Sequence, residues 1–272
     1  MAANEDSAFV CRRVLRFGGD ERRSEDDRIA EEVPIALRYN GQPFAVMLAT
    51  PCDIEDFALG FSLSEGLIEA PPQLLGCEIR PLLEGIEVDL RVAEDAPAAR
   101  LGEASGRLLP GRSGCGLCGA RALEDALRLP RPVHTTRRFT LAALRRALGA
   151  LPSLQPLNAA TGAVHAAAWA DGAGAIGLLR EDIGRHNAVD KLIGALSLSD
   201  LPIHEGMLLV TSRASYEIVL KAASAGVGLL AALSAPTALA VDLAERAGLC
   251  LVGFARAETC NIYAHAERLL GD

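Results

Sequence analysis

Short apolar runs alternate with helical patterns along the second half of the chain. Each run has the length of a buried strand, and each pattern between them has the length of a helix. This alternation is typical of an α/β unit in which helices cover both faces of a mostly parallel sheet. The predicted strands are residues 174–179, 207–211, 229–234 and 249–254, and the predicted helices are residues 140–151, 186–196, 215–225 and 236–247.

The pattern before this unit predicts a smaller α+β unit. Asn40 and Gly41 stand between two alternating runs, and this pair of residues strongly favours a tight β-hairpin turn. The segment TPCDIEDFALGFSLSEGL then reads as a helix, with Asp53 expected to cap its start and Gly66 to end it. The strands of this unit are predicted at residues 34–40, 43–49, 76–81 and 86–92.

Four segments therefore organise the chain. The first is dense in charged side chains and has few large apolar ones, so we expect a loosely ordered tail with a short strand near residues 10–17. The segments are the tail at 1–32, the small α+β domain at 33–112, a mobile loop with a following helix at 113–138, and the larger α/β domain at 139–272.

Charge and composition narrow the possible partners. The formal net charge is −8, whereas nucleic-acid binders normally carry a basic excess, so no nucleic-acid partner is expected. The seven cysteines are an odd number in a chain too large to depend on disulfides, which predicts reduced thiols and a cytoplasmic protein. The uncharged stretch 222–241 is rich in small residues and contains Pro236, so we expect buried elements there and no membrane span.

Polar clusters containing arginine follow three of the predicted strands. Ligands bind beyond the carboxyl ends of strands in an open parallel sheet, and a guanidinium grips a phosphate through two hydrogen bonds. Together the clusters predict a pocket for a phosphate-bearing small molecule, most simply a nucleotide; each alone could be a solvated arginine paired with a nearby acid. The clusters are Arg180, Asp182, Arg185, His186 and Asn187, then Ser212, Arg213 and Ser215, then Arg256, Glu258 and Asn261.

Residues 113–119 read SGCGLCG and place Cys115 and Cys118 at C-x-x-C spacing. This spacing serves disulfide exchange, zinc binding and sulfur carriage. Sulfur carriage needs a thiolate, which the flanking Arg112 and Arg121 favour, and the glycines leave the segment free to move. Thiol–disulfide exchange stays open as an alternative, although such enzymes usually hold the pair at the start of a helix that directly follows a strand.

Zinc binding does not fit the neighbouring residues. A structural site would need two further ligands, and Cys77, Cys250 and Cys260 stand apart from the pair. The zinc site of nucleobase deaminases uses H-x-E and P-C-x-x-C, whereas here two alanines follow His165 and the corresponding strand end reads SRAS. We therefore expect no tightly held metal.

Six segments of the chain resemble the FdhD family, sulfur carriers required to make formate dehydrogenase active. They cover most of residues 34–270 in the family's order. One departure is Cys52, where the family usually has glycine. The segments are TPCDIEDFALGFSLSEGLI, SGCGLCG, TGAVHAAA, EDIGRHNAVDKLIG, TSRASYEIVLKAASAGV and GFARAETCNIYAHAERL.

The resemblance implies a function. A cysteine desulfurase would hand a sulfane sulfur to the cysteine pair, with Cys115 as the persulfide carrier. The sulfur would then pass to molybdenum bis(molybdopterin guanine dinucleotide) before that cofactor enters formate dehydrogenase. The resemblance also implies a homodimer and a larger domain similar to the cytidine deaminase fold. A nucleotide-sensing partner protein with redox-active thiols is the alternative from another class.

The resemblance further assigns residues to the cofactor pocket. The family's cofactor-binding segment matches residues 254–259, and the other motif residues are expected in the same pocket by position. The full set is Phe254, Ala255, Arg256, Ala257, Glu258 and Thr259, together with His165, Arg185, His186, Asn187, Ser212, Arg213 and Asn261.

Overall fold

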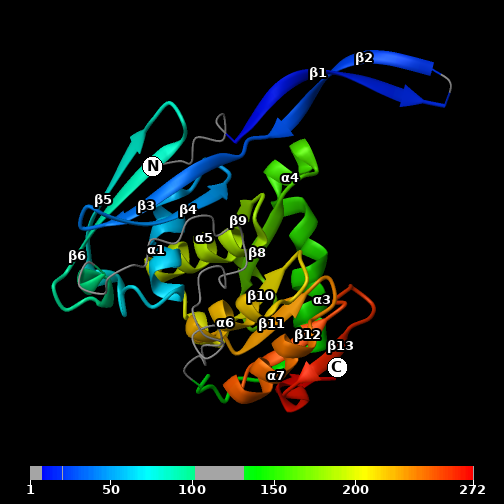
Figure 1. The fold of residues 1–272 in the computed structure, drawn as a ribbon. Coiled ribbons are helices and arrows are strands. Elements are labelled where there is room, and N and C mark those ends of the chain that lie inside the picture. Colours follow the sequence, from blue (N-terminus) through cyan, green and yellow to red (C-terminus); the bar gives the residue numbers. More distant parts are fainter. Residues whose placement is uncertain (1–7, 20, 102–131, 272) are drawn as a thin grey trace.

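The structure is a computed structural model that describes residues 8–19, 21–101 and 132–271 (Figure 1). Two β-sheets with their helices form its body. The smaller sheet has the strand order β4-β3-β6-β5, and the larger has the order β13-β12-β11-β10-β8-β9. A separate hairpin of β1 and β2 projects from the body, at the upper right of Figure 1. The mixed α/β class is therefore confirmed.

The N-terminal hairpin corrects the prediction of a loosely ordered tail at residues 1–32 for the part that the structure describes, residues 8–19 and 21–32. Strand β1 (Phe9–Gly18) pairs antiparallel with β2 (Glu21–Ala30), which confirms the predicted short strand and extends it. Opposite charges face each other across the strands at Arg12 and Asp27 and at Arg13 and Asp26, and Arg16 forms a diagonal ion pair with Glu25 at 2.7 Å.

The smaller sheet confirms the predicted hairpin, helix and strands. Asn40 and Gly41 have φ angles of 48° and 76°, as a tight turn of this kind requires. Helix α1 ends at Ser64 with Glu65 as its C-cap, and Gly66 follows with a φ of 68°. The predicted side-chain cap is wrong. The backbone of Asp53 is in the left-handed conformation, and its side chain makes no capping hydrogen bond to α1. The elements are β3 (Val33–Tyr39), β4 (Gln42–Ala49), α1 (Ile54–Ser64), β5 (Leu74–Pro81) and β6 (Ile86–Val92).

The larger sheet is mixed, so the prediction of a mostly parallel sheet is wrong. Among the described strands, β11 is parallel to β10 and β12, whereas β8 is antiparallel to both β9 and β10, and β13 is antiparallel to β12. The strands are β8 (His165–Ala170), β9 (Ile176–Asp182), β10 (Met207–Val210), β11 (Leu229–Ala232), β12 (Cys250–Gly253) and β13 (Asn261–Ala264); β7 (Phe139–Thr140) pairs separately with β14 (Leu269–Leu270).

Helices cover both faces of the larger sheet, as predicted. Helices α5, α6 and α7 pack on one face, and α3 packs on the other. The Thr140 hydroxyl caps α3 by accepting a hydrogen bond from the Ala143 amide at 3.1 Å. No helix in the described part of the chain is long and apolar enough to cross a membrane. The helices are α3 (Leu141–Ala150), α4 (Pro156–Thr161), α5 (Arg185–Ser197), α6 (Tyr216–Ser224) and α7 (Ala238–Ala247).

Helices α1 and α5 join the two sheets by an unusually close crossing. A Cβ atom at Gly60 would collide with the Asp190 carbonyl oxygen, and one at Gly194 would collide with the carbonyl oxygen of Asp56. Buried polar groups lie beside the crossing: the Lys221 ammonium is 2.9 Å from both the Asp190 carboxylate and the Ser64 hydroxyl. The small α+β unit therefore packs directly against α5 through α1.

A basic site at the carboxyl end of the larger sheet

The three arginine-containing clusters lie at the ends of β9, β10 and β12, which finish on the same side of the larger sheet, as predicted. The His165 ring lies 3.3 Å from the Thr211 hydroxyl, the Ser234 amide donates to the Ser212 carbonyl at 3.4 Å, and the Phe254 amide donates to the Ser234 carbonyl at 3.1 Å. Because β8 is antiparallel to both of its neighbours, β9 and β10 still end on the same side. The correction to the sheet's topology thus leaves this edge unchanged.

Arg185 and Arg213 give the edge its positive charge. Arg185 is the first residue of α5, and its buried Nε has no hydrogen-bond partner among the described residues. Burial and then the charge of Arg213 lower the pKa of the Arg185 guanidinium, while Glu217 opposes this. Two guanidinium groups that repel each other, one with an unused buried donor, are suited to share an anion.

Two histidines stand beside these arginines. Burial lowers the pKa of His165, and the charges of Arg185 and His186 lower it further. The His186 ring is buried, with Nε2 at 2.8 Å from the Glu217 carboxylate and 3.3 Å from the Ser215 hydroxyl. We call Arg185, Arg213, His165 and His186 the basic site. Its counterion Glu217 was missed by sequence analysis, and only its place in the first turn of a predicted helix could have indicated it.

Two residues of the first cluster, Asp182 and Asn187, hold the backbone turn that precedes Arg185 through buried hydrogen bonds. The Asp182 carboxylate is fully buried and accepts hydrogen bonds from the amides of Thr50 at 3.0 Å and Gly184 at 2.7 Å. The Asn187 amide donates to Asp182 at 3.0 Å and to the Leu48 carbonyl at 2.8 Å. The side-chain NH₂ of Asn187 is thus engaged in positioning the turn before Arg185.

Arg180, from the same cluster, points away from the basic site. Its Nε lies 2.8 Å from the Asp56 carboxylate and 3.7 Å from that of Asp53. Arg180 is therefore an arginine paired with nearby carboxylates and does not face the ligand pocket that the clusters predict.

The segment 254–259 follows β12 at the same edge. Phe254 has a φ of 47°, which is rare and strained for an aromatic residue, and its side chain is 46% exposed. The Arg256 guanidinium donates to the carbonyls of Leu233 and Ala255, so it shapes the turn. The Arg256 amide donates to the Thr259 carbonyl at 2.8 Å. The remaining residues predicted for the pocket lie as follows. Ala255 is buried, whereas Ala257, Glu258 and Asn261 are exposed. The Ser212 hydroxyl donates a hydrogen bond to the Arg213 carbonyl.

The predicted sulfur-carrying pair, Cys115 and Cys118, lies outside the described residues, as does most of the predicted loop at 113–138. The free cysteines that the structure describes are Cys11, Cys52, Cys77, Cys250 and Cys260. Burial raises the pKa of Cys52, although its sulfur lies 3.7 Å from the Lys191 ammonium. Within the described part of the chain, no three His, Cys, Asp or Glu side chains gather in a way that could hold a metal ion.

Comparison with known proteins finds relatives that match almost the whole chain. The chain is 51% identical over 260 residues to the sulfur carrier protein FdhD of Xanthomonas campestris pv. campestris, covering 96% of this chain and 92% of the relative. It is 52% identical over 256 residues to the sulfur carrier protein FdhD of Cupriavidus necator, covering 94% and 88% of the two chains. A crystal structure from Desulfotalea psychrophila, described as a candidate formate dehydrogenase accessory protein, superposes with a TM-score of 0.73 at 23% identity, covering 97% of this chain and all of that one.

The described chain thus has the mixed α/β fold of that crystal structure. The family model described as the FdhD/NarQ family matches residues 30–270. The chain belongs to the FdhD/NarQ family.

Proposed function

We propose that this protein is a sulfur carrier that delivers sulfur to the molybdenum cofactor of a formate dehydrogenase. A cysteine desulfurase supplies the sulfur, Cys115 carries it as a persulfide, and molybdenum bis(molybdopterin guanine dinucleotide) receives it as a bound substrate. The names of the relatives support the carrier role, and the basic site supports a nucleotide-bearing acceptor. The family resemblance further leads us to expect a cytoplasmic homodimer whose larger domain is similar to the cytidine deaminase fold.

Loading the carrier is an exchange that needs no added oxidant or reductant. The Cys115 thiolate attacks the terminal sulfur of the desulfurase persulfide, and a new S–S bond forms as the donor's S–S bond breaks. The desulfurase cysteine leaves as a thiolate and takes up a proton. Cys118 can then receive the sulfur, or it can attack the Cys115 sulfur and release hydrosulfide as the two cysteines form a disulfide.

The observation that carries the nucleotide half of the proposal is the unpartnered, buried Nε of Arg185 beside Arg213. A phosphate of the guanine dinucleotide would accept hydrogen bonds from both guanidinium groups and offset their repulsion. The strained and exposed Phe254 at the same edge offers a face on which a base can stack. The residues present thus suit the guanine dinucleotide part of the cofactor.

Two measurements test the two halves separately. After incubation with a desulfurase and cysteine, the intact mass should rise by one sulfur, about 32 Da, removable by a reductant and absent in Cys115→Ala. Guanosine diphosphate should bind to the wild type and to Cys115→Ala alike, and Arg185→Met should weaken its binding at least about tenfold. A sulfur adduct retained in Cys115→Ala would move the carrier role to Cys118, and undiminished binding to Arg185→Met would remove the basic site from the proposal.

The alternatives give different outcomes. A nucleotide-sensing protein with redox-active thiols would still support formate dehydrogenase under reducing conditions when Cys115 and Cys118 are both serine. A sulfur carrier with the same changes would lose that support while still binding the guanine nucleotide. A thiol–disulfide oxidoreductase would reduce a disulfide substrate without acquiring the sulfur adduct.

A further inference from the structure

Two polar contacts join α5 and α6, the helices that start at the edge where the basic site lies. In the outer contact, His186 Nε2 lies 2.8 Å from the Glu217 carboxylate. In the inner contact, the Lys221 ammonium lies 2.9 Å from the Asp190 carboxylate. Asp190 follows His186 by four residues, and Lys221 follows Glu217 by four, so the two contacts lie one turn apart between facing sides of the helices. We call them the outer rung and the inner rung.

The inner rung is buried and is shared with the smaller unit. The side chains of Lys221 and Asp190 are 6% and 1% exposed. At the end of α1, the Ser64 hydroxyl and the Glu65 carboxylate lie 2.9 Å and 3.1 Å from the Lys221 ammonium. Although burial lowers the pKa of Lys221, Asp190 and Glu65 raise it above its ordinary value, so the lysine keeps its charge. One cation therefore joins α1, α5 and α6 at a single point.

The outer rung engages a carboxylate whose charge reaches Arg185. Burial and then Arg213 lower the pKa of the Arg185 guanidinium, and Glu217 opposes them. Among the residues that the structure describes, Glu217 nevertheless lies against His186 and forms no ion pair with Arg185. The outer rung therefore keeps a competing acid away from the arginine that a phosphate would use.

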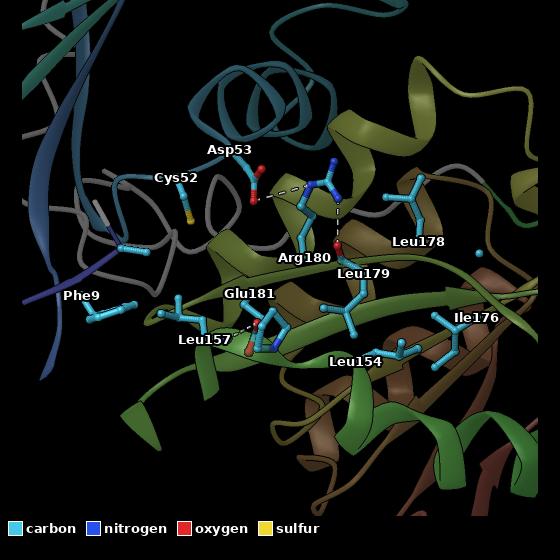
Figure 2. Close-up of a pocket in the computed structure, with 13 residues that line it drawn as sticks. Phe9, Cys52, Asp53, Leu154, Leu157, Ile176, Leu178, Leu179, Arg180 and Glu181 are labelled. Carbon is cyan, nitrogen blue, oxygen red and sulfur yellow. Dashed lines mark hydrogen bonds and ion pairs between the residues drawn. The ribbon is translucent and has the colours of Figure 1, made fainter. Parts of the chain in front are cut away.

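Arg180 shows what happens to an arginine that nearby acids can reach. Its Nε lies 2.8 Å from the Asp56 carboxylate, and Figure 2 shows the side chain turned toward Asp53. Its Nη1 donates to the Leu179 carbonyl at 2.9 Å. The guanidinium of Arg180 is thus engaged by its own chain, whereas the buried Nε of Arg185 has no partner among the described residues.

We propose that Lys221 is a positioning residue for the basic site: the inner rung holds α6 in register with α5, so that Glu217 meets His186. Arg185 is thereby left open to a phosphate. Arg213 lies just before α6, so the register of this helix also sets the distance between the two guanidinium groups. Without the inner rung, α6 can shift, and Glu217 can pair with Arg185 in place of the phosphate. This inference deepens the proposed binding of the guanine dinucleotide and rests on it.

The chemistry of the inner rung favours positioning over added stability. Replacing a buried ion pair by uncharged side chains of similar volume is often neutral or stabilising, so the pair is weak evidence for a stabilising role. What the pair supplies is direction. An ammonium has three N–H donors, and Lys221 directs them at Asp190, Glu65 and Ser64, which lie on α5 and at the end of α1. The place of Lys221, and with it the place of α6, is therefore fixed by partners on two other elements.

Calorimetric titration of the full chain with guanosine diphosphate tests the proposal. Lys221→Met should weaken binding at least about tenfold, because Glu217 then competes with the phosphate for Arg185. Leu144→Ala is the control for lost stability. Leu144 is buried on α3, on the other face of the larger sheet, so its replacement should destabilise the fold and leave the affinity unchanged.

A double-mutant cycle separates positioning from a merely structural role. In a Glu217→Gln background the competing charge is absent, so Lys221→Met should change the affinity less than about twofold. Where Lys221→Met alone does not fold, Asp190→Asn combined with Lys221→Met serves in its place, since it removes both charges of the inner rung and keeps the shapes of the side chains. The combined variant should bind the nucleotide at least about fivefold more weakly than the wild type, and Glu217→Gln should again abolish the difference.

The outcomes distinguish this inference from the proposed function. Full affinity in the Lys221 variants, or an equal loss with and without Glu217→Gln, would overturn the inference alone. A wild type that does not bind guanosine diphosphate would overturn the proposed nucleotide site and this inference together.

Discussion

The Lys191 ammonium lies 2.7 Å from the Asp182 carboxylate, and neither side chain is exposed to solvent. Lys191 also donates to the Thr50 carbonyl at 3.0 Å, and Asp182 accepts the Thr50 amide. One ion pair in the larger unit thus binds the loop that precedes α1 in the smaller one. The same Asp182 fixes the turn that carries Arg185, so the joint between the two units and the basic site depend on one pair.

Lys191→Met should destabilise the fold by about 3–5 kcal/mol, because it leaves the Asp182 carboxylate buried without its counterion. Denaturant unfolding followed by circular dichroism measures the loss. Arg80→Met is the control, since it breaks an ion pair between exposed side chains, Arg80 and Glu78, and should leave the unfolding curve unchanged. Equal effects from both variants would contradict the role assigned to the buried pair.

Gly60→Ala should cost about 1–3 kcal/mol or more, because the added Cβ would collide with the backbone of α5. Gly149→Ala is a matched control within a helix: nothing lies within 4 Å of its added Cβ. That control should gain roughly 0.5–1 kcal/mol, since alanine is the better helix former. The two midpoints of thermal unfolding should therefore move in opposite directions, and a stable Gly60→Ala protein would show that the helices can separate without loss.

Strands and helices with a clear pattern were predictable, whereas β8 was not. Its sequence HAAAWA has three consecutive alanines, which neither alternate nor favour strands. These alanines are buried on β8, which lies between β10 and the edge strand β9, with Ala167 under one layer of helices and Ala168 under the other. Missing β8 made the sheet look mostly parallel, although β9, β10 and β12 were correctly expected to end on one side of it.

The site's composition was more predictable than its side-chain directions. The predicted end of a strand indicates that Arg180 and Arg185 lie near the same end of the sheet. The packing around each residue decides in which direction its side chain extends. Arg180 turns to Asp56, a partner 124 residues earlier in the chain. Asn187 is likewise drawn to Leu48, from the smaller unit. Such contacts depend on how the two units dock, which local sequence patterns do not specify.

The Cys77 thiol should react slowly compared with the exposed Cys11 thiol. Burial, with Glu55 adding to it, raises the pKa of Cys77 to about 11. At pH 7.5 such a thiol is ionised in about one molecule in 3,000, and the thiolate is the reactive form. We expect iodoacetamide to label Cys77 at least about 100-fold more slowly than the exposed Cys11, with a rate that rises about tenfold per pH unit up to about pH 11. Peptide mass spectrometry of timed samples measures both rates. Comparable rates at pH 7.5 would mean that the Cys77 thiolate is stabilised in the fold.

His165 should be neutral at pH 7 and should gain a proton more readily when an anion binds. Burial, then Arg185 and His186, lower its pKa below the ordinary value. A histidine whose pKa is lower in the folded state stabilises the fold above its unfolded pKa of about 6.5, and that contribution is lost as pH falls through the folded pKa. A phosphate bound between Arg185 and Arg213 adds negative charge nearby, so guanosine diphosphate should raise the pKa of His165.

Nuclear magnetic resonance titration of the histidine ring protons measures this shift, with His165→Asn identifying the signal. Arg185→Met should raise the pKa of His165 in the free protein, because a positive charge is removed, and should reduce the further rise on adding nucleotide. His204 is exposed and serves as an internal control whose ring-proton signals should not move when the nucleotide is added. A pKa of His165 that is unchanged by saturating guanosine diphosphate would place the bound phosphate elsewhere, even if the protein binds the nucleotide tightly.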